Sequence, residues 1–177
     1  MLITLDGIDG VGKSTISALL KERLNAYIIK GVRDDYVDKL AYSSNHIDVK
    51  CLYYLASFID SALDSKIERN EIIVFDKSFY STIVYHKLLG SKINIEKILT
   101  EIVAPDLKVY LTCPRFLWQE RLKKRNKIDW YEKQLLESEE FASKIEDAYS
   151  ELGLIRIENI NIEDTFYKIV DLIDKIK

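Results

Sequence analysis

The chain has 177 residues, 47% of them hydrophobic, which suits one domain built around a single core. Its 26 basic and 29 acidic side chains give a formal net charge of −3, which offers no overall attraction to nucleic acid. The longest apolar runs are far shorter than the roughly 20 residues of a membrane-spanning helix, and the first residues lack a secretory pattern. We therefore expect a cytoplasmic protein that acts on small ligands, without a nucleic acid or membrane partner.

The first apolar run, residues 2–5, leads into GIDGVGKS at residues 7–14, which matches the phosphate-binding pattern G-x-x-x-x-G-K-[ST] in full. Glycines let the backbone N–H groups of such a loop face a triphosphate, and Lys13 is placed to reach its β and γ phosphates. The hydroxyl of Ser14 is expected on Mg²⁺. The residues predicted to bind the nucleotide here are Asp9, Gly10, Val11, Gly12, Lys13, Ser14 and Thr15.

Four more apolar runs follow, at residues 27–29, 72–75, 107–111 and 154–157, and each precedes a helix-like segment. Continuous apolar strands that alternate with helices indicate a buried parallel sheet. We predict an α/β fold of three layers, a five-stranded parallel sheet between helices, formed by one domain over residues 1–177. The longest helix candidate runs from about residue 48 to residue 69.

Ligands of open α/β sheets bind beyond the carboxyl ends of the strands. Asp76 directly follows the third apolar run, where a carboxylate can meet Mg²⁺ or an attacking hydroxyl. Phosphoryl transfer also needs cations around the transferred group. Arg121 and Arg125 lie four residues apart, on one helical face, after the fourth run, and we expect a mobile lid around residues 121–132. Arg33 and Lys77 are candidate ligands for a phosphate on the acceptor.

These residues together resemble thymidylate kinase over nearly the whole chain. The resemblance rests on LDGIDGVGKST at residues 5–15, VRD at 32–34, LYYLA at 52–56, PDLKVYL at 105–111 and the segment 127–132. It implies use of ATP with Mg²⁺, catalysis by a lid arginine and a homodimer formed through the long helices. By the same resemblance, Asp9 binds the acceptor sugar, Arg33 its phosphate and Tyr53 its base. Asn161 falls in the loop that contacts adenine.

The sequence also departs from that family. Residues 76–78 read Asp-Lys-Ser where the family has Asp-Arg followed by Tyr or Phe, and Ser57 and Trp130 stand at arginine positions. His86 replaces a usual glutamine. The Asp-Lys-Ser segment is similar to the Glu-Arg-Ser motif of deoxynucleoside kinases, in which the acid accepts a proton from the sugar hydroxyl.

Three functions follow from these observations. The leading hypothesis is an ATP-dependent nucleoside monophosphate kinase, in which Lys13 and the lid arginines act on the transferred group and Ser14 and Asp76 organise Mg²⁺. Its acceptor ligands are expected to be Asp9, Arg33, Tyr53, Lys77 and Ser81. The alternatives are a kinase for nucleosides or other small hydroxylated acceptors, with Asp76 as the base, and a nucleotide-dependent switch or binding protein.

Overall fold

The strands form one parallel sheet in the computed structural model, which describes residues 1–30, 39–40, 43–63, 72–93, 103–124, 128 and 130–177, without the side chains of 130 and 131. The strand order is β2-β3-β1-β4-β5, and every neighbouring pair is parallel. The strands are β1 (Leu2–Asp6), β2 (Tyr27–Lys30), β3 (Ile73–Asp76), β4 (Leu107–Thr112) and β5 (Ile155–Glu158). The predicted five-stranded parallel sheet is confirmed, and Asp76 belongs to β3 rather than following it.

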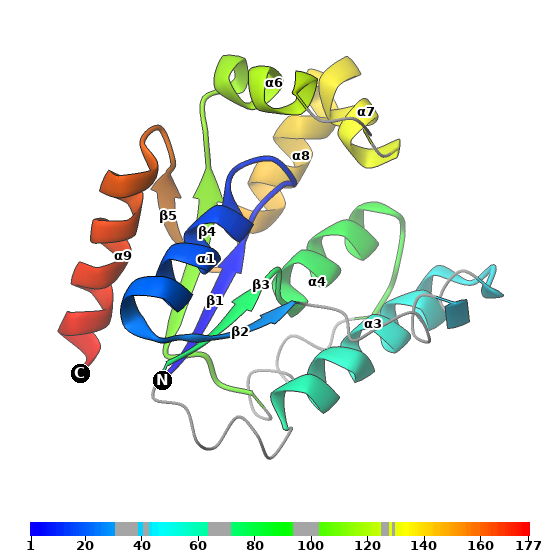
Figure 1. Cartoon of the computed structure of the whole chain (residues 1–177). Helices are drawn as coiled ribbons and strands as arrows, with labels where there is room; N and C mark the ends of the chain where they lie inside the picture. The colour runs from blue at the N-terminus through cyan, green and yellow to red at the C-terminus, as the bar shows by residue number, and fades with distance from the viewer. Residues whose placement is uncertain (31–38, 41–42, 64–71, 94–102, 125–127, 129) are drawn as a thin grey trace.

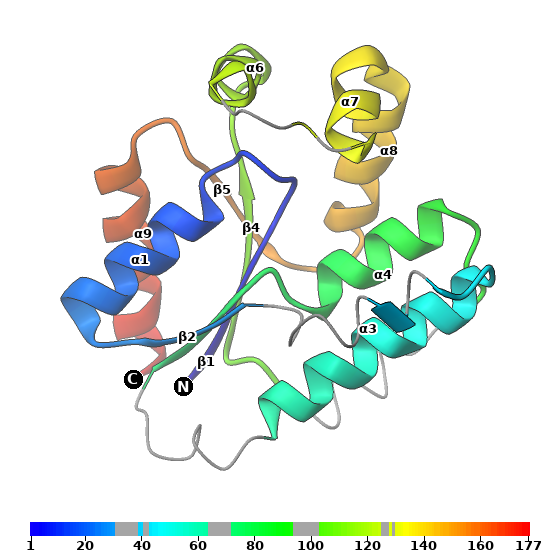
Figure 2. The same cartoon turned by 45° about the vertical axis from the view of Figure 1, so that its right-hand side comes forward.

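Helices cover both faces of the sheet (Figures 1 and 2). One face carries α1 (Lys13–Leu24) and α9 (Ile162–Ile176), and the other carries α3 (Ile47–Ala62), α4 (Phe79–Leu88) and α8 (Glu139–Ser150). Ile3 and Leu5 of β1 lie in the larger core with Ile16, Leu20 and Ile169, all fully buried. This confirms the three-layer α/β arrangement. Helix α3 ends at Ala62, and residues 64–69 of the helix expected to reach residue 69 lie outside the described part.

A second core packs α3 and α4 against β3. The ring of Phe58 lies 4.4 Å from that of Phe75 and 4.9 Å from that of Phe79, centroid to centroid. Aromatic pairs at this spacing add attraction beyond their buried area. They fix α4, which begins two residues after Lys77, against the strand that ends at Asp76.

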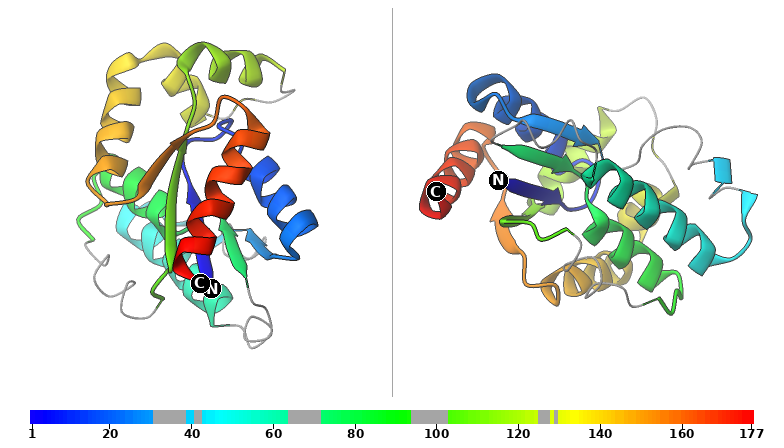
Figure 3. Two further views of the ribbon diagram at one scale, coloured as in Figure 1. Left: turned by 90° about the vertical axis from the view of Figure 1, so that its left-hand side faces the viewer. Right: turned by 90° about the horizontal axis from the view of Figure 1, so that it is seen from below.

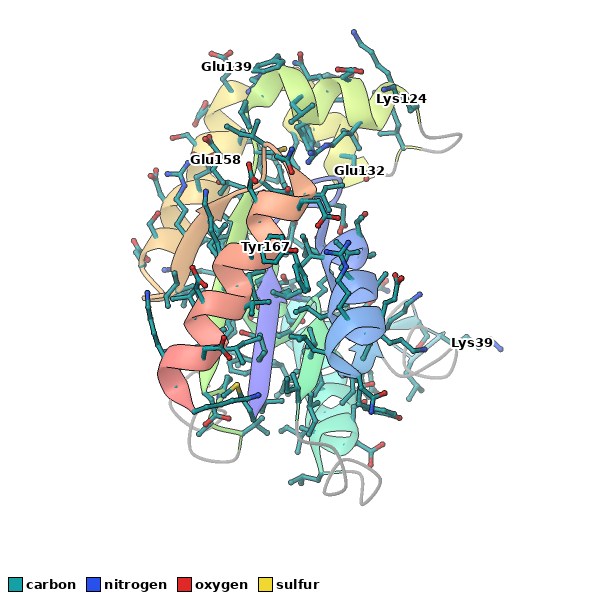
Figure 4. The ribbon with its side chains drawn as sticks, turned by 60° about the vertical axis from the view of Figure 1, so that its left-hand side comes forward. Lys39, Lys124, Glu132, Glu139, Glu158 and Tyr167 are labelled. Atoms are coloured by element: carbon teal, nitrogen blue, oxygen red, sulfur yellow. The ribbon has the colours of Figure 1, made fainter. Side chains whose placement is uncertain are left out.

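All five strands are parallel, so their carboxyl ends form one edge of the sheet. In Figure 1, β1 and β4 point upward, and α6 (Arg115–Lys123) and α7 (Trp130–Glu137) lie beyond their ends. Both chain termini lie at the opposite edge (Figure 3). Lys124 and Glu139 are exposed on the outside of this region, whereas Glu132 of α7 is buried (Figure 4). The carboxyl edge is therefore where side chains from the strands and from the α6 region converge.

Among the helices that the structure describes, none combines the length and the apolar character needed to span a bilayer.

Candidate active site

The phosphate-binding loop connects β1 to α1. It begins at Gly7, directly after Asp6, and ends at Gly12, which is the N-cap of α1 with a φ of 103°. Residues with a Cβ avoid this region. A Cβ at Gly12 would also lie only 2.3 Å from the amide nitrogen of Asn159. Glycine is thus required here both by the backbone angle and by the close approach of Asn159.

Side chains from two later elements hold the carbonyl groups of this loop. Trp118 of α6 donates its indole N–H to the Asp9 carbonyl at 2.7 Å. The Val11 carbonyl accepts from Asn159 Nδ2 at 2.7 Å and from Arg121 at 3.1 Å. Because the C=O and N–H of a trans peptide point in opposite directions, these bonds turn the amides of Gly10 and Gly12 away from the three donors. A phosphate cradle needs amides that are free to face the anion in this way.

The side chain of Lys13 is buried against the phosphate-binding loop. Its ammonium donates to the carbonyls of Gly7 at 2.8 Å and Ile8 at 3.0 Å, and to Asp9 Oδ1 at 3.0 Å. The other carboxylate oxygen of Asp9 accepts from Lys77 Nζ at 2.9 Å. Asp9 therefore joins the lysine of the loop to the lysine that follows β3. All three residues lie at the carboxyl edge of the sheet, as the sequence predicts.

Electrostatics around these lysines favour a charged Asp9. Burial alone would raise the pKa of Asp9, but the ammonium groups of Lys13 and Lys77 outweigh it and hold this pKa well below its usual range. Burial lowers the pKa of Lys13, and the carboxylates of Asp9 and Asp76 oppose that shift. The cluster thus carries two cations and two acids next to the phosphate cradle.

Asp76 and Ser14 are the candidate ligands for Mg²⁺. Asp76 ends β3 beside Leu5 of β1 and is 7% exposed, and Ser14 is exposed in the first turn of α1. The described residues contain no group of three or more His, Cys, Asp or Glu side chains arranged for a metal. Mg²⁺ in nucleotide sites commonly takes only one or two protein oxygens, its other ligands being phosphates and water. One hydroxyl and one carboxylate fit that chemistry.

Ser81, expected to bind the acceptor, has other contacts. It is 1% exposed, and its hydroxyl donates to Asp6 Oδ1 at 2.7 Å and lies 2.8 Å from the hydroxyl of Tyr149 in α8. The buried carboxylate of Asp6 also accepts from Ser78. The structure therefore places Ser81 in the interior, where its hydroxyl joins α4 to β1 and α8.

The remaining predicted residues lie apart from this cluster or outside the described chain. Asn161 is the N-cap of α9, and its side-chain oxygen accepts from the amides of Glu163 at 2.8 Å and Asp164 at 3.2 Å. Tyr53 is half-buried on α3. Arg33 and Arg125 lie outside the described residues, as does the side chain of Trp130.

The loop that the sequence assigned to adenine contains Asn159, but neither Asn159 nor Trp118 was expected to hold the phosphate-binding loop. Asn159 is fully buried, and its Oδ1 accepts from the Thr165 hydroxyl at 3.0 Å. In the sequence, Asn159 directly follows β5, and Trp118 lies among the charged residues of a basic helix. Both residues act through backbone carbonyls, which no sequence motif records.

A glycine loop between β1 and α1, with a buried lysine at its end, in a parallel sheet of order 2-3-1-4-5 defines a P-loop phosphotransferase of the nucleoside monophosphate kinase type. The sequence model of the family described as thymidylate kinase matches residues 5–176, and the chain belongs to that family. It is a thymidylate kinase-like nucleotide kinase.

Individual relatives agree with this assignment. A probable thymidylate kinase of Methanococcus maripaludis is 34% identical, over 89% of this chain and 78% of the relative. One from Methanosphaera stadtmanae is 29% identical, over 93% of this chain and 92% of the relative.

Solved structures share the fold. Thymidylate kinase from Candida albicans superposes with a TM-score of 0.71 at 18% identity, over 98% of this chain and 91% of the other. Deoxyadenosine kinase from M. mycoides gives a TM-score of 0.67 at 21% identity, over the full length of both chains. Both types of kinase therefore have this arrangement of strands and helices.

Proposed function

We propose that the protein transfers the γ-phosphoryl group of ATP, with Mg²⁺, to a deoxynucleoside monophosphate. The observation that carries the proposal is the position of the Asp9 carboxylate, 3.0 Å from the ammonium of Lys13 and 2.9 Å from that of Lys77. Lys13 belongs to the phosphate-donor loop, and Lys77 follows a different strand. Lys13 can bind the phosphates of the donor and Lys77 the phosphate of the acceptor. Because both ammonium groups contact the same carboxylate, they would hold the two phosphates close together, as phosphoryl transfer requires.

On the donor side, the P-loop amides and Lys13 hold the triphosphate. Ser14 and Asp76 would hold Mg²⁺, which would supply positive charge to the phosphates of ATP. Arg121 donates to the carbonyls of Val11 at 3.1 Å and Asn159 at 3.2 Å, so its guanidinium lies on the loop that surrounds the phosphates. Arg121 can then supply positive charge to the transferred group without a large movement.

On the acceptor side, Asp9 accepts from the sugar hydroxyl and Lys77 binds the phosphate. The side chain of Lys77 is 42% exposed, so it can reach a ligand while remaining paired to Asp9. Arg33, Arg125 and Tyr53 keep the roles that the family resemblance implies, as does the lid around residues 121–132. Residues 1–177 form a single kinase domain in this proposal.

A nucleoside acceptor is the second candidate, because the Asp-Lys-Ser segment is similar to the motif of deoxynucleoside kinases and a deoxyadenosine kinase shares the fold. The contacts of Ser78 weaken this argument. Its hydroxyl donates to Asp6 at 2.6 Å and accepts from the Tyr80 amide at 3.2 Å, capping α4. A serine at this position therefore has a structural use that is independent of the acceptor, which leaves Lys77 as the discriminating residue.

The test is a coupled ADP-release assay with MgATP over a panel of nucleosides and their monophosphates. We expect turnover with at least one deoxynucleoside monophosphate and little with the matching nucleoside. Lys77→Ala should raise the KM for the monophosphate about tenfold or more, because it removes one charge-assisted contact to phosphate, and leave the KM for ATP nearly unchanged. Turnover of nucleosides alone would replace the proposal by the second candidate.

We also propose a homodimer, and a cytoplasmic location as for the family. In support of the dimer, α3 exposes the apolar side chains of Val49 and Leu52, at 36% and 49%, and its C-cap Leu63 is 64% exposed. Light scattering at micromolar concentration tests the dimer: a mass near twice 20.6 kDa is expected, and a mass near 20.6 kDa would contradict it.

A further inference from the structure

The backbone of Lys77 is held in a conformation that lysine rarely adopts. Its φ is 72°, in the left-handed region. The other described residue besides glycine with a positive φ is Asn25, which ends α1 and belongs to a residue type that tolerates this region. Lysine is not a residue type that tolerates this region, and strained backbone of this kind persists only where the surrounding structure imposes it.

Two hydrogen bonds to β1 fix the peptides on either side of Lys77. Its own amide donates to the Leu5 carbonyl at 3.0 Å, and the next amide, that of Ser78, donates to Asp6 Oδ1 at 3.0 Å. The first bond continues the sheet. The second depends entirely on the side chain of Asp6, so this carboxylate holds the carboxyl end of the turn.

The carboxylate of Asp6 is the centre of a buried hydrogen-bond network. It is fully buried and accepts from four donors, the amides and hydroxyls of Ser78 and Ser81, at 2.6 to 3.2 Å. Burial raises the pKa of Asp6, and these four hydrogen bonds oppose the shift. Three of these donors bond to Oδ1, and the Ser78 hydroxyl bonds to Oδ2. An asparagine oxygen could still accept the three bonds at Oδ1, whereas removal of the whole carboxylate leaves all four donors without this acceptor.

The turn that Asp6 holds sets the direction of the Lys77 side chain. Its ammonium lies 2.9 Å from Asp9 Oδ2 and 5.4 Å from the centre of the Tyr85 ring. A change of φ at Lys77 would send the side chain from the Cα atom in another direction. We propose that Asp6 is a positioning residue, which holds Lys77 in the left-handed conformation and thereby aims its ammonium at Asp9 and the acceptor phosphate. The acceptor part of this inference rests on the proposed function.

The test is a double-mutant cycle with Asp6→Ala and Lys77→Gly. Alanine removes the acceptor of the Ser78 amide, and glycine removes the ammonium and accepts a φ of 72° without strain. We expect each single variant to lower kcat/KM for the monophosphate by roughly 10-fold to 100-fold, since a misplaced or missing contact costs about that much. If Asp6 acts through Lys77, adding Asp6→Ala to Lys77→Gly should lower kcat/KM by no more than about threefold. Factors that multiply would overturn the inference.

A matched control removes a hydrogen bond at the outside of the same buried network. Tyr149→Phe deletes the hydroxyl that lies 2.8 Å from Ser81 Oγ, without touching Asp6 or the Ser78 amide. Its effect on kcat/KM should be the same within about twofold in the presence and absence of Lys77→Gly, because it does not act through Lys77. A coupling to Lys77→Gly as large as that of Asp6→Ala would show a general response to loosening of α4 and would overturn the inference.

A second readout does not depend on turnover. Lys77→Gly removes the strained backbone and also the contact of the ammonium with Asp9. Its effect on Tm should therefore differ clearly between the wild type and the Asp6→Ala background, where the turn has already relaxed. Equal shifts in both backgrounds would overturn the inference. If no monophosphate is turned over, the proposed function fails while this cycle of Tm values still decides the role of Asp6. If Asp6→Ala does not fold, Asp6→Glu, which displaces the carboxylate by one methylene, replaces it in the same cycle.

Discussion

Replacement of Asn159 by alanine should loosen the phosphate-binding loop from outside. The variant removes the donor 2.7 Å from the Val11 carbonyl and the acceptor 3.0 Å from the Thr165 hydroxyl, at a fully buried position. Each buried group left without a partner costs about 1–3 kcal/mol. Neither group is left without a partner here, because Arg121 still donates to Val11 at 3.1 Å and the single hydroxyl hydrogen of Thr165 can go to the Asn161 carbonyl at 2.8 Å. The cost is then that of one or two lost hydrogen bonds at about 1 kcal/mol each, and we expect a loss of about 1–2 kcal/mol in the free energy of unfolding.

The same change should weaken ATP binding, because the peptide between Val11 and Gly12 loses the bond that orients its amide. A loss of about 1.4 kcal/mol in preorganisation corresponds to a tenfold rise in Kd. Urea unfolding and calorimetric titration with ATP measure the two effects. Asn161→Ala is the matched control: it removes the N-cap of α9, costs about 1 kcal/mol, and should leave the Kd for ATP within about twofold if Asn161 only caps the helix. Wild-type affinity in Asn159→Ala together with a large loss in Asn161→Ala would refute this reasoning.

Three further predictions concern the charged cluster. The pKa of Asp9 is lower in the folded chain than in the unfolded chain. Ionised Asp9 therefore stabilises the fold fully above the unfolded pKa of about 3.9, and this stabilisation is lost as the pH falls from there toward the folded pKa. Urea midpoints should fall less steeply below about pH 4 in Asp9→Asn than in the wild type, and equal slopes would contradict the shift. Asp76→Asn should lower kcat by roughly 100-fold and raise the Mg²⁺ concentration needed for half-maximal rate, since it removes a carboxylate at the metal; an unchanged rate would exclude Asp76 from the reaction. Arg121→Ala should lower kcat by about 100-fold or more, and a normal kcat in steady-state kinetics would place the catalytic arginine elsewhere.

The three central strands followed directly from the sequence, because parallel strands buried on both faces appear as continuous apolar runs. The edge strands β2 and β5 were also placed correctly from shorter apolar runs, although most of their residues are not buried. The P-loop was equally readable, since its glycines and Lys13 have geometric roles that fix their spacing. Asp76 was predicted at the correct edge because ligands of open α/β sheets bind beyond the carboxyl ends of the strands. These features depend on local sequence and on a general rule for sheets.

The contacts that shape the site were not readable in this way. Asn159 lies 148 positions from Val11, and Trp118 lies 109 positions from Asp9, yet each holds the loop through a backbone carbonyl. Ser81 was assigned to the acceptor because it follows the Asp-Lys-Ser segment, but the fold directs its hydroxyl inward to Asp6. Asp6 was not singled out by the sequence. Side chains that serve other residues leave no motif, so only their packing reveals them.

The most direct test of the proposed activity is transfer of the labelled γ-phosphoryl group of ATP in the presence of Mg²⁺ and a deoxynucleoside monophosphate. Chromatography of the products should show label in the deoxynucleoside diphosphate, with its formation abolished in Lys13→Met. Label found only in inorganic phosphate, or only in the monophosphate formed from an added nucleoside, would contradict the assignment of a nucleoside monophosphate kinase.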